Sequence, residues 1–324
     1  MKVGIFTSNP NFLGPIIESL LRHGHEILLW KSTREPQANW INLQRILDRC
    51  DVAFFDWTQN PFLNAMRIEA LSCKIVVRAH GLPFFDIYET FPWQKVDLMI
   101  GSAVIFGQRM KKVKNQPKRY LHIPPGSDPT LFTIPANKKY HQNLCTHSMF
   151  IRFKKRVYTT LQTFYDVLQR DRRWKLHLVG SWESPAGWEG TNYTEPCKEL
   201  MEDLDIGSKV YLSPNMPPAR WAAWLRDMDI FVSNSLREGL QVSVVDAMLA
   251  GVYPLINCWR GSDEYYPADN IFKTQSELVD KIFEWEGRSV EEKRRLSGEM
   301  RAWAAERFDG AILADRLVEA LETL

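Results

Sequence analysis

The chain contains few cysteines, and they form no recognisable pattern. Five cysteines occur in 324 residues, and none is spaced as C-x-x-C. An odd, scattered set argues against a disulfide framework and a cysteine-based zinc site, and it favours a reducing compartment. The opening MKVGIFTSNP turns polar after Phe6, and no later apolar run is long enough to cross a bilayer. We therefore expect a cytoplasmic protein.

A strong net charge, internal repeats and a dinucleotide fingerprint are also missing. The net charge is +2, so bulk electrostatics does not indicate a nucleic-acid binder. After the first predicted strand the chain reads FTSNPNFLG, which cannot supply the G-x-G-x-x-G of a Rossmann oxidoreductase, so that class is disfavoured. What remains is an ordinary globular composition, 45% hydrophobic and 25% charged, with a length that suits two domains.

The order of apolar runs predicts alternating strands and helices. The runs are continuous, which is typical of parallel strands covered on both faces. Helical patterns separate several of them, for example at residues 13–22, 61–71 and 157–168. The predicted strands are KVGIF, HEILLW, DVAFF, KIVVR, DLMIG and YLHI in the first half, and MFI, KLHLVG, KVYLS, DIFVS and YPLIN in the second.

A segment without periodicity, residues 123–143, interrupts this rhythm. It is rich in proline and turn-forming residues and is the predicted linker. We predict an N-terminal Rossmann-like domain at 1–137, a C-terminal Rossmann-like domain at 138–307, and a helix at 308–324 that packs back on the first domain. The predicted fold class is α/β, with two doubly wound parallel-sheet domains facing across a cleft. Ligands in such folds bind beyond the carboxyl ends of the strands.

The stretch SNSLREGLQVSVVDAMLAGVYPLI, residues 233–256, carries the main chemical signal. It reads as a strand end, a loop, a helix and a strand, with Glu238 in the loop and Asp246 in the helix. Free amide groups at a helix N-terminus bind anions, and Gly239 lets the backbone approach a ligand. A phosphate at the helix start, a diol beside Asp246 and hydroxyls beside Glu238 describe a nucleotide sugar. The alternative is that both carboxylates are merely solvated.

The same stretch resembles the E-x7-E signature of the retaining GT-B glycosyltransferases of family four, the glycosyl transferases group 1. The family pattern S-x-x-E-G-F-G-L-x-x-x-E-A-M-A-x-G-x-P-V compares with SLREGLQVSVVDAMLAGVYPL, in which Asp246 replaces the second Glu. IPPGSDPTLF and WRGSDEYYPADNIF are similar to further family blocks, in the same order. The resemblance implies the GT-B fold and, without a cofactor, sugar transfer from a UDP- or GDP-sugar to an acceptor hydroxyl with retention of anomeric configuration.

The resemblance also implies roles for particular residues of the second domain. On the turn FIRFKKR, Arg152 and Lys155 would stabilise the donor diphosphate. This turn departs from the family's G-R…K-G, so Lys154 or Arg156 are alternatives for the lysine, and a solvated basic turn is a further interpretation. Glu238 would hold sugar hydroxyls as a catalytic residue and Asp246 the ribose. The other donor-binding candidates are Ser235, the backbone amides of Gly239, Leu240 and Gln241, and, near the nucleotide base, Asn215 and Met216.

Two further candidates lie in the first half of the chain, and no metal ligand is predicted. Gly14 opens the first helix, where the family has a glycine-rich turn. His80, in VVRAHGLP, follows a strand and is a catalytic candidate that would bind the transferred sugar or the acceptor hydroxyl, although a structural histidine fits equally well. Asp227 and Asp229 form a D-x-D pattern, but they straddle a helix end and a strand start. A helix N-terminus with Arg and Lys already supplies phosphate binding.

The partners remain open at this point. The run QRMKKVKNQPKRY is either a solvated surface or a peripheral contact at the inner membrane surface. The acceptor is a glycan, a lipid-linked molecule or a small molecule, and nucleic acid is disfavoured. The alternatives to transfer are a catalytically weak nucleotide-sugar-binding partner subunit and a GT-B sugar epimerase. The basic residues of the run are Arg109, Lys111, Lys112, Lys114, Lys118 and Arg119.

Overall fold

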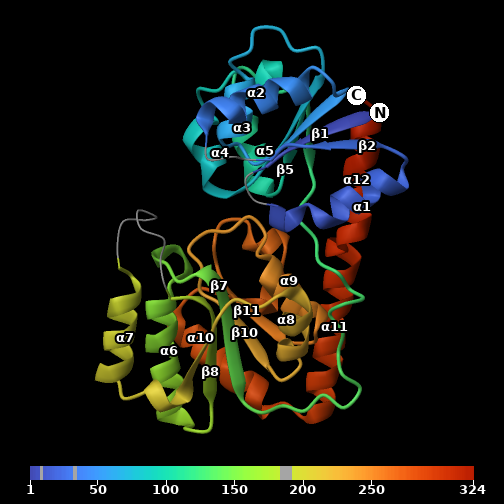
Figure 1. Cartoon of the computed structure of the whole chain (residues 1–324). Coiled ribbons are helices and arrows are strands. Elements are labelled where there is room, and N and C mark those ends of the chain that lie inside the picture. Colours follow the sequence, from blue (N-terminus) through green and yellow to red (C-terminus); the bar gives the residue numbers. More distant parts are fainter. Residues whose placement is uncertain (8–9, 32–34, 183–191) are drawn as a thin grey trace. The chain divides into compact units, whose positions relative to one another are not determined.

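The chain forms two compact units. Figure 1 shows the computed structural model, which describes residues 1–7, 10–31, 35–182 and 192–324. Unit 1 consists of Met1–Gly126 together with Phe308–Leu324, and unit 2 consists of Ser127–Arg307. Each unit is built around one parallel sheet.

The sheet of unit 1 is parallel throughout, with the strand order β2-β1-β3-β4-β5-β6 in the described residues. The predicted apolar runs of the first half are confirmed as its strands. β1 pairs with both β2 and β3, so the chain builds outward from β1 in both directions. The strand bounds are Lys2–Phe6, Glu26–Leu29, Val52–Asp56, Lys74–Ala79, Leu98–Gly101 and Arg119–His122 for β1 to β6.

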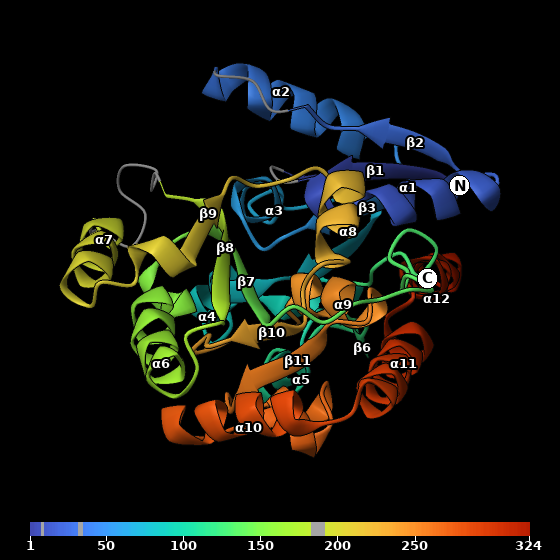
Figure 2. The ribbon, with the colours of Figure 1, turned by 90° about the horizontal axis from the view of Figure 1, so that it is seen from below.

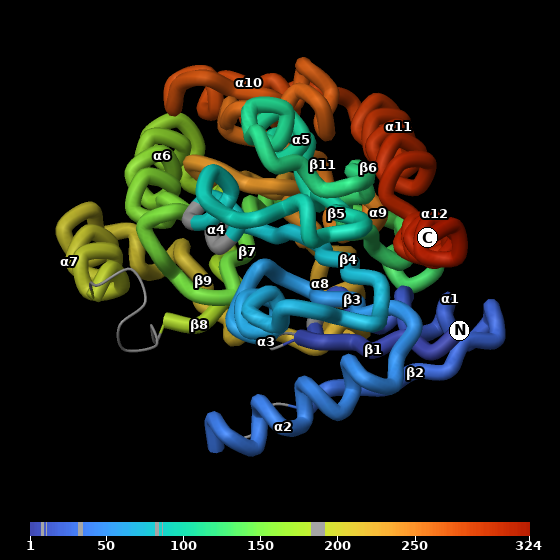
Figure 3. Tube along the Cα trace, turned by 90° about the horizontal axis from the view of Figure 1, so that it is seen from above, coloured from blue at the N-terminus to red at the C-terminus, as the bar shows by residue number. Residues whose placement is uncertain are grey.

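Helices cover both faces of the unit 1 sheet, and Figure 3 shows α1 and α12 on one face and α2 to α5 on the other. Alternate strand residues enter two separate cores: Ile5 and Phe54 pack with α1 and α12, whereas Phe6 and Phe55 pack with the other helices. The helix bounds are Gly14–Arg22 for α1, Pro36–Leu47 for α2, Asn60–Ala65 for α3, Gly81–Ile87 for α4, Val104–Met110 for α5 and Gly310–Glu322 for α12.

Unit 2 contains the second parallel sheet, with the order β12-β11-β10-β7-β8-β9 in the described residues. Figure 2 shows α6 and α10 on one side of this sheet and α8 and α9 on the other. The strands β7 to β12 are Asn143–Phe150, Lys175–Ser181, Val210–Ser213, Ile230–Ser233, Tyr253–Asn257 and Ile271–Phe272. The helices α6 to α11 are Val157–Arg170, Thr194–Asp203, Pro218–Leu225, Val242–Leu249, Gln275–Gly287 and Val290–Phe308.

The strand order of unit 2 reverses between β7 and β10. From β7 the chain continues to β8 on one side, and from β10 it continues to β11 on the other. Loops that leave neighbouring strands in opposite directions open a crevice at the carboxyl edge of a sheet, where doubly wound folds bind ligands. The fold therefore predicts a ligand site at the loops after β7 and β10.

Two predicted elements differ from the structure. The strand predicted at residues 149–151 is the end of β7, which already begins at Asn143. The polar residues Thr146, His147 and Ser148 interrupt the apolar run that marks a buried strand. The helix predicted at residues 61–71 ends at Ala65, where a short turn follows.

The aperiodic segment after β6 is fixed to unit 2 by hydrogen bonds. The Lys138 ammonium donates to the carbonyl oxygens of Arg226 at 3.1 Å and Met228 at 2.8 Å. Arg301 of α11 donates to the carbonyl oxygen of Pro129 at 2.8 Å. This segment is thus ordered by polar contacts instead of by secondary structure.

None of the helices in the described part of the chain combines the length and the apolar character that a membrane span requires.

The helix that follows the loop after β10 ends in a Schellman motif. Gly251 lies at the C′ position of α9 with φ +75°, and its amide donates to the carbonyl of Met248 at 3.0 Å. The amide of Val252 donates to the carbonyl of Ala247 at 2.8 Å, which completes the motif. A Cβ at this glycine would lie 2.7 Å from Cγ1 of Ile134. Both the left-handed backbone and the close approach require glycine.

We expect Gly251→Ala to lower the free energy of unfolding of unit 2 by about 2 kcal/mol, because the alanine adopts a left-handed conformation and contacts Ile134. Urea denaturation followed by tryptophan fluorescence measures the change. The matched control is Gly298→Ala in the exposed interior of α11, where a Cβ has open space. That variant should gain about 0.5–1 kcal/mol. Equal effects of the two substitutions would contradict this account.

Candidate functional site

The loops after β7 and β10 meet at the carboxyl edge of the unit 2 sheet. Residues 151–156 lead from β7 into α6 and contain the short 3-10 helix Phe153–Lys155. Residues 234–241 lead from β10 into α9. The amide of Leu236 in the second loop donates to the carbonyl oxygen of Lys154 in the first, at 2.9 Å. The backbones of the two loops are therefore fixed to each other.

Glu238 is held between two lysines at this junction. The Lys154 ammonium donates to Oε2 of Glu238 at 2.9 Å, and the Lys155 ammonium donates to Oε1 at 2.6 Å. The exposed fractions of the side chains are 9% for Glu238, 19% for Lys154 and 14% for Lys155. Glu238 and Lys155, both predicted from the sequence, are thus in contact, and Lys154 joins Lys155 instead of replacing it.

The electrostatics of this cluster keeps the carboxyl group ionised. Burial alone would raise the pKa of Glu238, but the attraction of Lys155 and Lys154 and their hydrogen bonds outweigh it and lower the pKa to about 2. Burial lowers the pKa of Lys155, Glu238 opposes this, and the like charges of Lys154 and Arg152 lower it further. The lysine is therefore crowded by cations.

The turn after β7 carries more positive charge than Glu238 neutralises. Lys154, Lys155 and Arg156 are basic, and in the described residues the ion pairs of the two lysines are with Glu238. Arg156 has φ +51° and ψ 43°, the left-handed conformation that glycine adopts most readily. The excess charge and the buried setting suit an anionic ligand with several oxygen atoms.

The start of α9 lies beside this cluster. Gln241 is the N-cap residue, and its side chain is fixed by the Ser233 hydroxyl, which donates to Oε1 at 2.6 Å. The side-chain amide of Gln241 donates to the Ser243 hydroxyl at 3.3 Å. Gly239 and Leu240 directly precede Gln241 in the chain, and Leu240 is buried. The first amides of this helix point toward the carboxyl edge of the sheet, as every helix N-terminus in a doubly wound fold does.

Asp246 lies inside unit 2, with both oxygen atoms engaged. The Ser127 hydroxyl donates to Oδ1 at 2.5 Å, and the indole N–H of Trp221 donates to Oδ2 at 3.0 Å. Burial raises the pKa of Asp246 to about 7, and the two hydrogen bonds offset only part of this effect. The carboxyl group therefore changes its charge close to neutral pH. Its role as ribose ligand remains a prediction.

His147 connects these residues to the predicted base site. Its ring lies 5.2 Å from the ring of Trp221, and burial together with the nearby Lys155 lowers its pKa to about 4. Asn215, predicted near the base, donates from its side chain to the carbonyl of Met149 at 2.9 Å. Met216 follows it in the same turn, at the end of β9. Ser235 is buried, and its carbonyl oxygen accepts from Asn257 at 3.0 Å.

His80 belongs to unit 1, where a buried ionic network holds it. Asp56 Oδ1 lies 2.9 Å from Nε2 of His80 and accepts from Nε of Arg78 at 2.7 Å. Burial, with Arg78 adding to it and Asp56 opposing it, lowers the pKa of His80. The ring of Trp57, which has φ +84°, lies 4.6 Å from the His80 ring. The network fixes the orientation of the His80 ring through the contact of its Nε2 with Asp56.

Gly14 and the basic run also lie in unit 1. Gly14 is the first residue of α1, and a Cβ there would meet no atom within 4 Å, so packing does not require glycine. Within the basic run, Lys118 pairs with Asp97 at 2.8 Å and Arg119 donates to Thr323 at 2.7 Å. Arg109 stacks over the ring of Tyr88, and Lys111, Lys112 and Lys114 are exposed.

A family model covers most of this site. Residues 141–267 match the family described as Glycosyl transferases group 1. The matched region contains the loops after β7 and β10 and the whole of α9. No curated protein matches the chain.

Several solved structures share the fold of the whole chain at low sequence identity. Anabaena HepE in complex with UDP-glucose is 13% identical, with a TM-score of 0.81 and 100% of both chains covered. Sucrose-phosphate synthase from Thermosynechococcus elongatus is 12% identical, with a TM-score of 0.78 and coverage of 100% and 98%. A glycosyltransferase from Rickettsia africae is 12% identical, with a TM-score of 0.75 and coverage of 99% and 97%. These likenesses confirm the predicted GT-B fold.

Three residues of the site were not predicted from the sequence, and a fourth, Lys154, was predicted only as an alternative. Ser127 lies in IPPGSDPTLF, a block that the family resemblance includes, but its partner Asp246 is 119 positions away. Trp221 and His147 belong to none of the motifs quoted from the sequence. Lys154 was an alternative to Lys155, whereas both bind Glu238.

The raised pKa of Asp246 predicts a dependence of stability on pH. In the folded chain this pKa is about 7, above its ordinary value of 3.8, so the stabilisation is complete below pH 4 and is lost as pH rises through 7. Between pH 5 and pH 8 the wild type should lose about 2–3 kcal/mol from this group. Asp246→Asn should not show that loss.

The measurement is the difference in the free energy of unfolding between pH 5 and pH 8. The control Asp166→Asn, exposed on α6, should follow the wild type. If Asp246→Asn keeps the same pH dependence as the wild type, the buried carboxyl group does not titrate near neutrality. The absolute stability of this variant is not the readout, since the asparagine amide also disturbs one hydrogen bond.

Proposed function

We propose that the chain is a glycosyltransferase of group 1 that moves a sugar from a nucleotide-diphosphate sugar to an acceptor hydroxyl, with retention of anomeric configuration. The observation that carries the proposal is Glu238, buried between Lys154 and Lys155 where the strand order reverses. The family match over residues 141–267 includes this cluster and supports the same activity.

The chemistry of the cluster favours a donor with a diphosphate and a polyol. The excess of basic side chains suits the diphosphate oxygens, because charge-assisted hydrogen bonds to phosphate are strong. An ionised carboxylate such as Glu238 accepts hydrogen bonds from sugar hydroxyls. We assign the ribose to Asp246 and the base to the turn with Asn215 and Met216. The UDP-glucose in the HepE structure supports a UDP-sugar, and a GDP-sugar is the other candidate.

In the proposed reaction, the bond between the anomeric carbon and the diphosphate oxygen breaks, and a bond from the acceptor oxygen to that carbon forms on the same face. The acceptor proton passes to the departing phosphate. Arg152, Lys155 and Lys154 stabilise the charge that develops on this leaving group. Glu238 orients the sugar and keeps the two ammonium groups in position. The charge on these side chains supports a reaction without a divalent cation or another cofactor.

We assign His80 and Gly14 of unit 1 to the transferred sugar and the acceptor side. Nε2 of His80 lies on Asp56, and we assign its Nδ1 to a hydroxyl group of the substrate. The acceptor is proposed to be a glycan, a lipid-linked molecule or a small hydroxyl compound. The exposed Lys111, Lys112 and Lys114 support a peripheral contact with an anionic membrane surface on the cytoplasmic side.

The test of this function starts with a thermal-shift screen of UDP- and GDP-sugars. A donor that binds the native state raises the melting temperature. At 100 times its Kd it adds about 2.7 kcal/mol to the free energy of unfolding. The selected donor is then incubated with hydroxyl acceptors, and NMR of the product assigns the anomeric configuration. Release of nucleoside diphosphate without an acceptor separates a transferase from a subunit that only binds the donor. An inverted product would overturn retention, and no shift with any donor would overturn the function.

Glu238→Gln should reduce turnover about 100-fold or more without unfolding the chain, because the amide neither holds both ammonium groups nor accepts like a carboxylate. Initial rates with saturating donor measure the effect. Glu199→Gln, which removes an exposed carboxylate from α7, is the matched control and should keep the wild-type rate. Wild-type turnover in Glu238→Gln would remove Glu238 from the reaction.

A further inference from the structure

Three residues with metal-ligating side chains meet at one end of unit 1, far along the sequence from one another. His23 is the C-cap residue of α1, Gly24 follows with φ +75°, and His25 leads into β2. Glu322 is the last residue of α12, which packs beside α1 on the same face of the sheet. The turn at Gly24 directs both histidines toward the end of α12.

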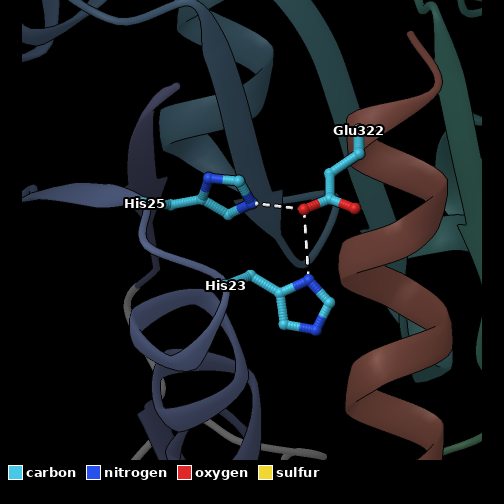
Figure 4. Close-up of side chains that lie close together, drawn as sticks. All are labelled: His23, His25 and Glu322. Carbon is cyan, nitrogen blue, oxygen red and sulfur yellow. Dashed lines mark hydrogen bonds and ion pairs between the residues drawn. The ribbon is translucent and has the colours of Figure 1, made fainter.

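The side chains converge on a single point. Figure 4 shows both imidazole rings turned toward the same carboxylate oxygen of Glu322. Nδ1 of His23 lies 3.1 Å from this oxygen, Oε1, and Nε2 of His25 lies 2.9 Å from it. One ligand atom from each residue lies within 4.8 Å of the others. The second carboxylate oxygen of Glu322 points away from both rings.

Two imidazole nitrogens and one carboxylate oxygen are ligands that Zn²⁺ prefers. Zinc bonds of 2.0–2.1 Å in a tetrahedron set the ligand atoms about 3.3 Å apart, which is near the two distances from Glu322. The site also lies at the C-terminal ends of two helices, where the peptide dipoles favour a cation.

A second carboxylate, that of Asp315, lies near His23. Asp315 Oδ1 lies 4.0 Å from Nε2 of His23, the ring nitrogen that faces away from Glu322. Asp315 is itself fixed by the Ser19 hydroxyl at 2.5 Å and by Arg22 at 2.6 Å. At this distance the two atoms form no direct hydrogen bond, and Asp315 adds a negative charge beside His23. The side chains of His23 and Glu322 are 27% and 38% exposed, so an ion and a water ligand have access.

We propose that unit 1 binds one Zn²⁺ ion through His23, His25 and Glu322. The ion replaces the hydrogen bonds to Glu322 and joins the C-terminal ends of α1 and α12. The ion stabilises unit 1, because it links residues 23 and 322 and so closes a loop that contains nearly the whole chain. The site shares no residue with the proposed sugar-transfer site. The sequence carries no local signal of this site, because H-x-H and a glutamate 297 positions away form no short motif.

The test uses the tag-free full chain, stripped with EDTA, dialysed to remove the chelator and then equilibrated with zinc chloride. The wild type should retain one zinc per chain by elemental analysis, and its melting temperature should rise by about 5 °C with excess zinc. Glu322→Gln and His25→Gln should each lose the bound zinc and the thermal shift. Glu319→Gln, exposed on the same helix, is the matched control and should behave as the wild type.

The readout is the zinc-dependent change within each variant, because Glu322→Gln also removes hydrogen bonds and lowers the metal-free melting temperature. Cobalt bound to the wild type provides a second measurement that needs no variant, since four-coordinate Co²⁺ has strong visible absorption. Wild-type protein without stoichiometric zinc would overturn the proposal. So would variants that retain zinc, or cobalt spectra typical of six-coordinate surface binding.

Discussion

The attraction between one buried carboxylate and two ammonium groups is the interaction on which the candidate site of unit 2 depends. Burying the charge of Glu238 or of Lys155 alone would cost free energy. Each compensates the other through a hydrogen bond of 2.6 Å, and Lys154 adds a second hydrogen bond to Glu238 at 2.9 Å. Removing one partner from such a buried pair typically costs about 3–5 kcal/mol, because the remaining charge loses its counterion. The cluster is therefore ordered before any ligand binds, and its remaining positive charge is directed at a ligand that supplies more anionic oxygen atoms.

The topology of the sheet explains why this cluster forms where it does. β7 and β10 are neighbours, yet the chain leaves them toward opposite sides, with α6 after β7 and α9 after β10. The basic turn and the acidic loop are thereby brought together although Lys154 and Glu238 are 84 positions apart. The hydrogen bond between their backbones and the Schellman end of α9 fix the two loops and the helix. In the proposed reaction this site contributes positioning and charge stabilisation.

The parts of this arrangement that follow local rules were predictable, and the parts that depend on distant partners were not. Continuous apolar runs identified the strands, and the E-x7-D spacing in a strand-loop-helix identified the loop with Glu238. β7 was recognised only at its end, because Thr146, His147 and Ser148 give no apolar signal. The pairing of Asp246 with Ser127 joins a helix to an aperiodic segment, and no periodicity can reveal it. The contact of Glu238 with both Lys154 and Lys155 depends on the directions of the lysine side chains. Those directions follow from a turn that ends at Arg156 in the left-handed conformation, which residue propensities do not predict.

The central claim is that the basic cluster around Glu238 binds a diphosphate, and calorimetric titration tests it most directly. UDP and GDP are titrated into the wild type, Lys155→Met and Glu238→Gln. Lys155→Met removes a cation and should weaken the binding of the favoured diphosphate about tenfold or more, which is at least 1.4 kcal/mol. Glu238→Gln removes the carboxylate that competes for the lysines and should strengthen the binding of the diphosphate. The corresponding monophosphate should bind more weakly than the diphosphate to all three chains. Equal affinity in the three chains, or no binding to any of them, would contradict the account.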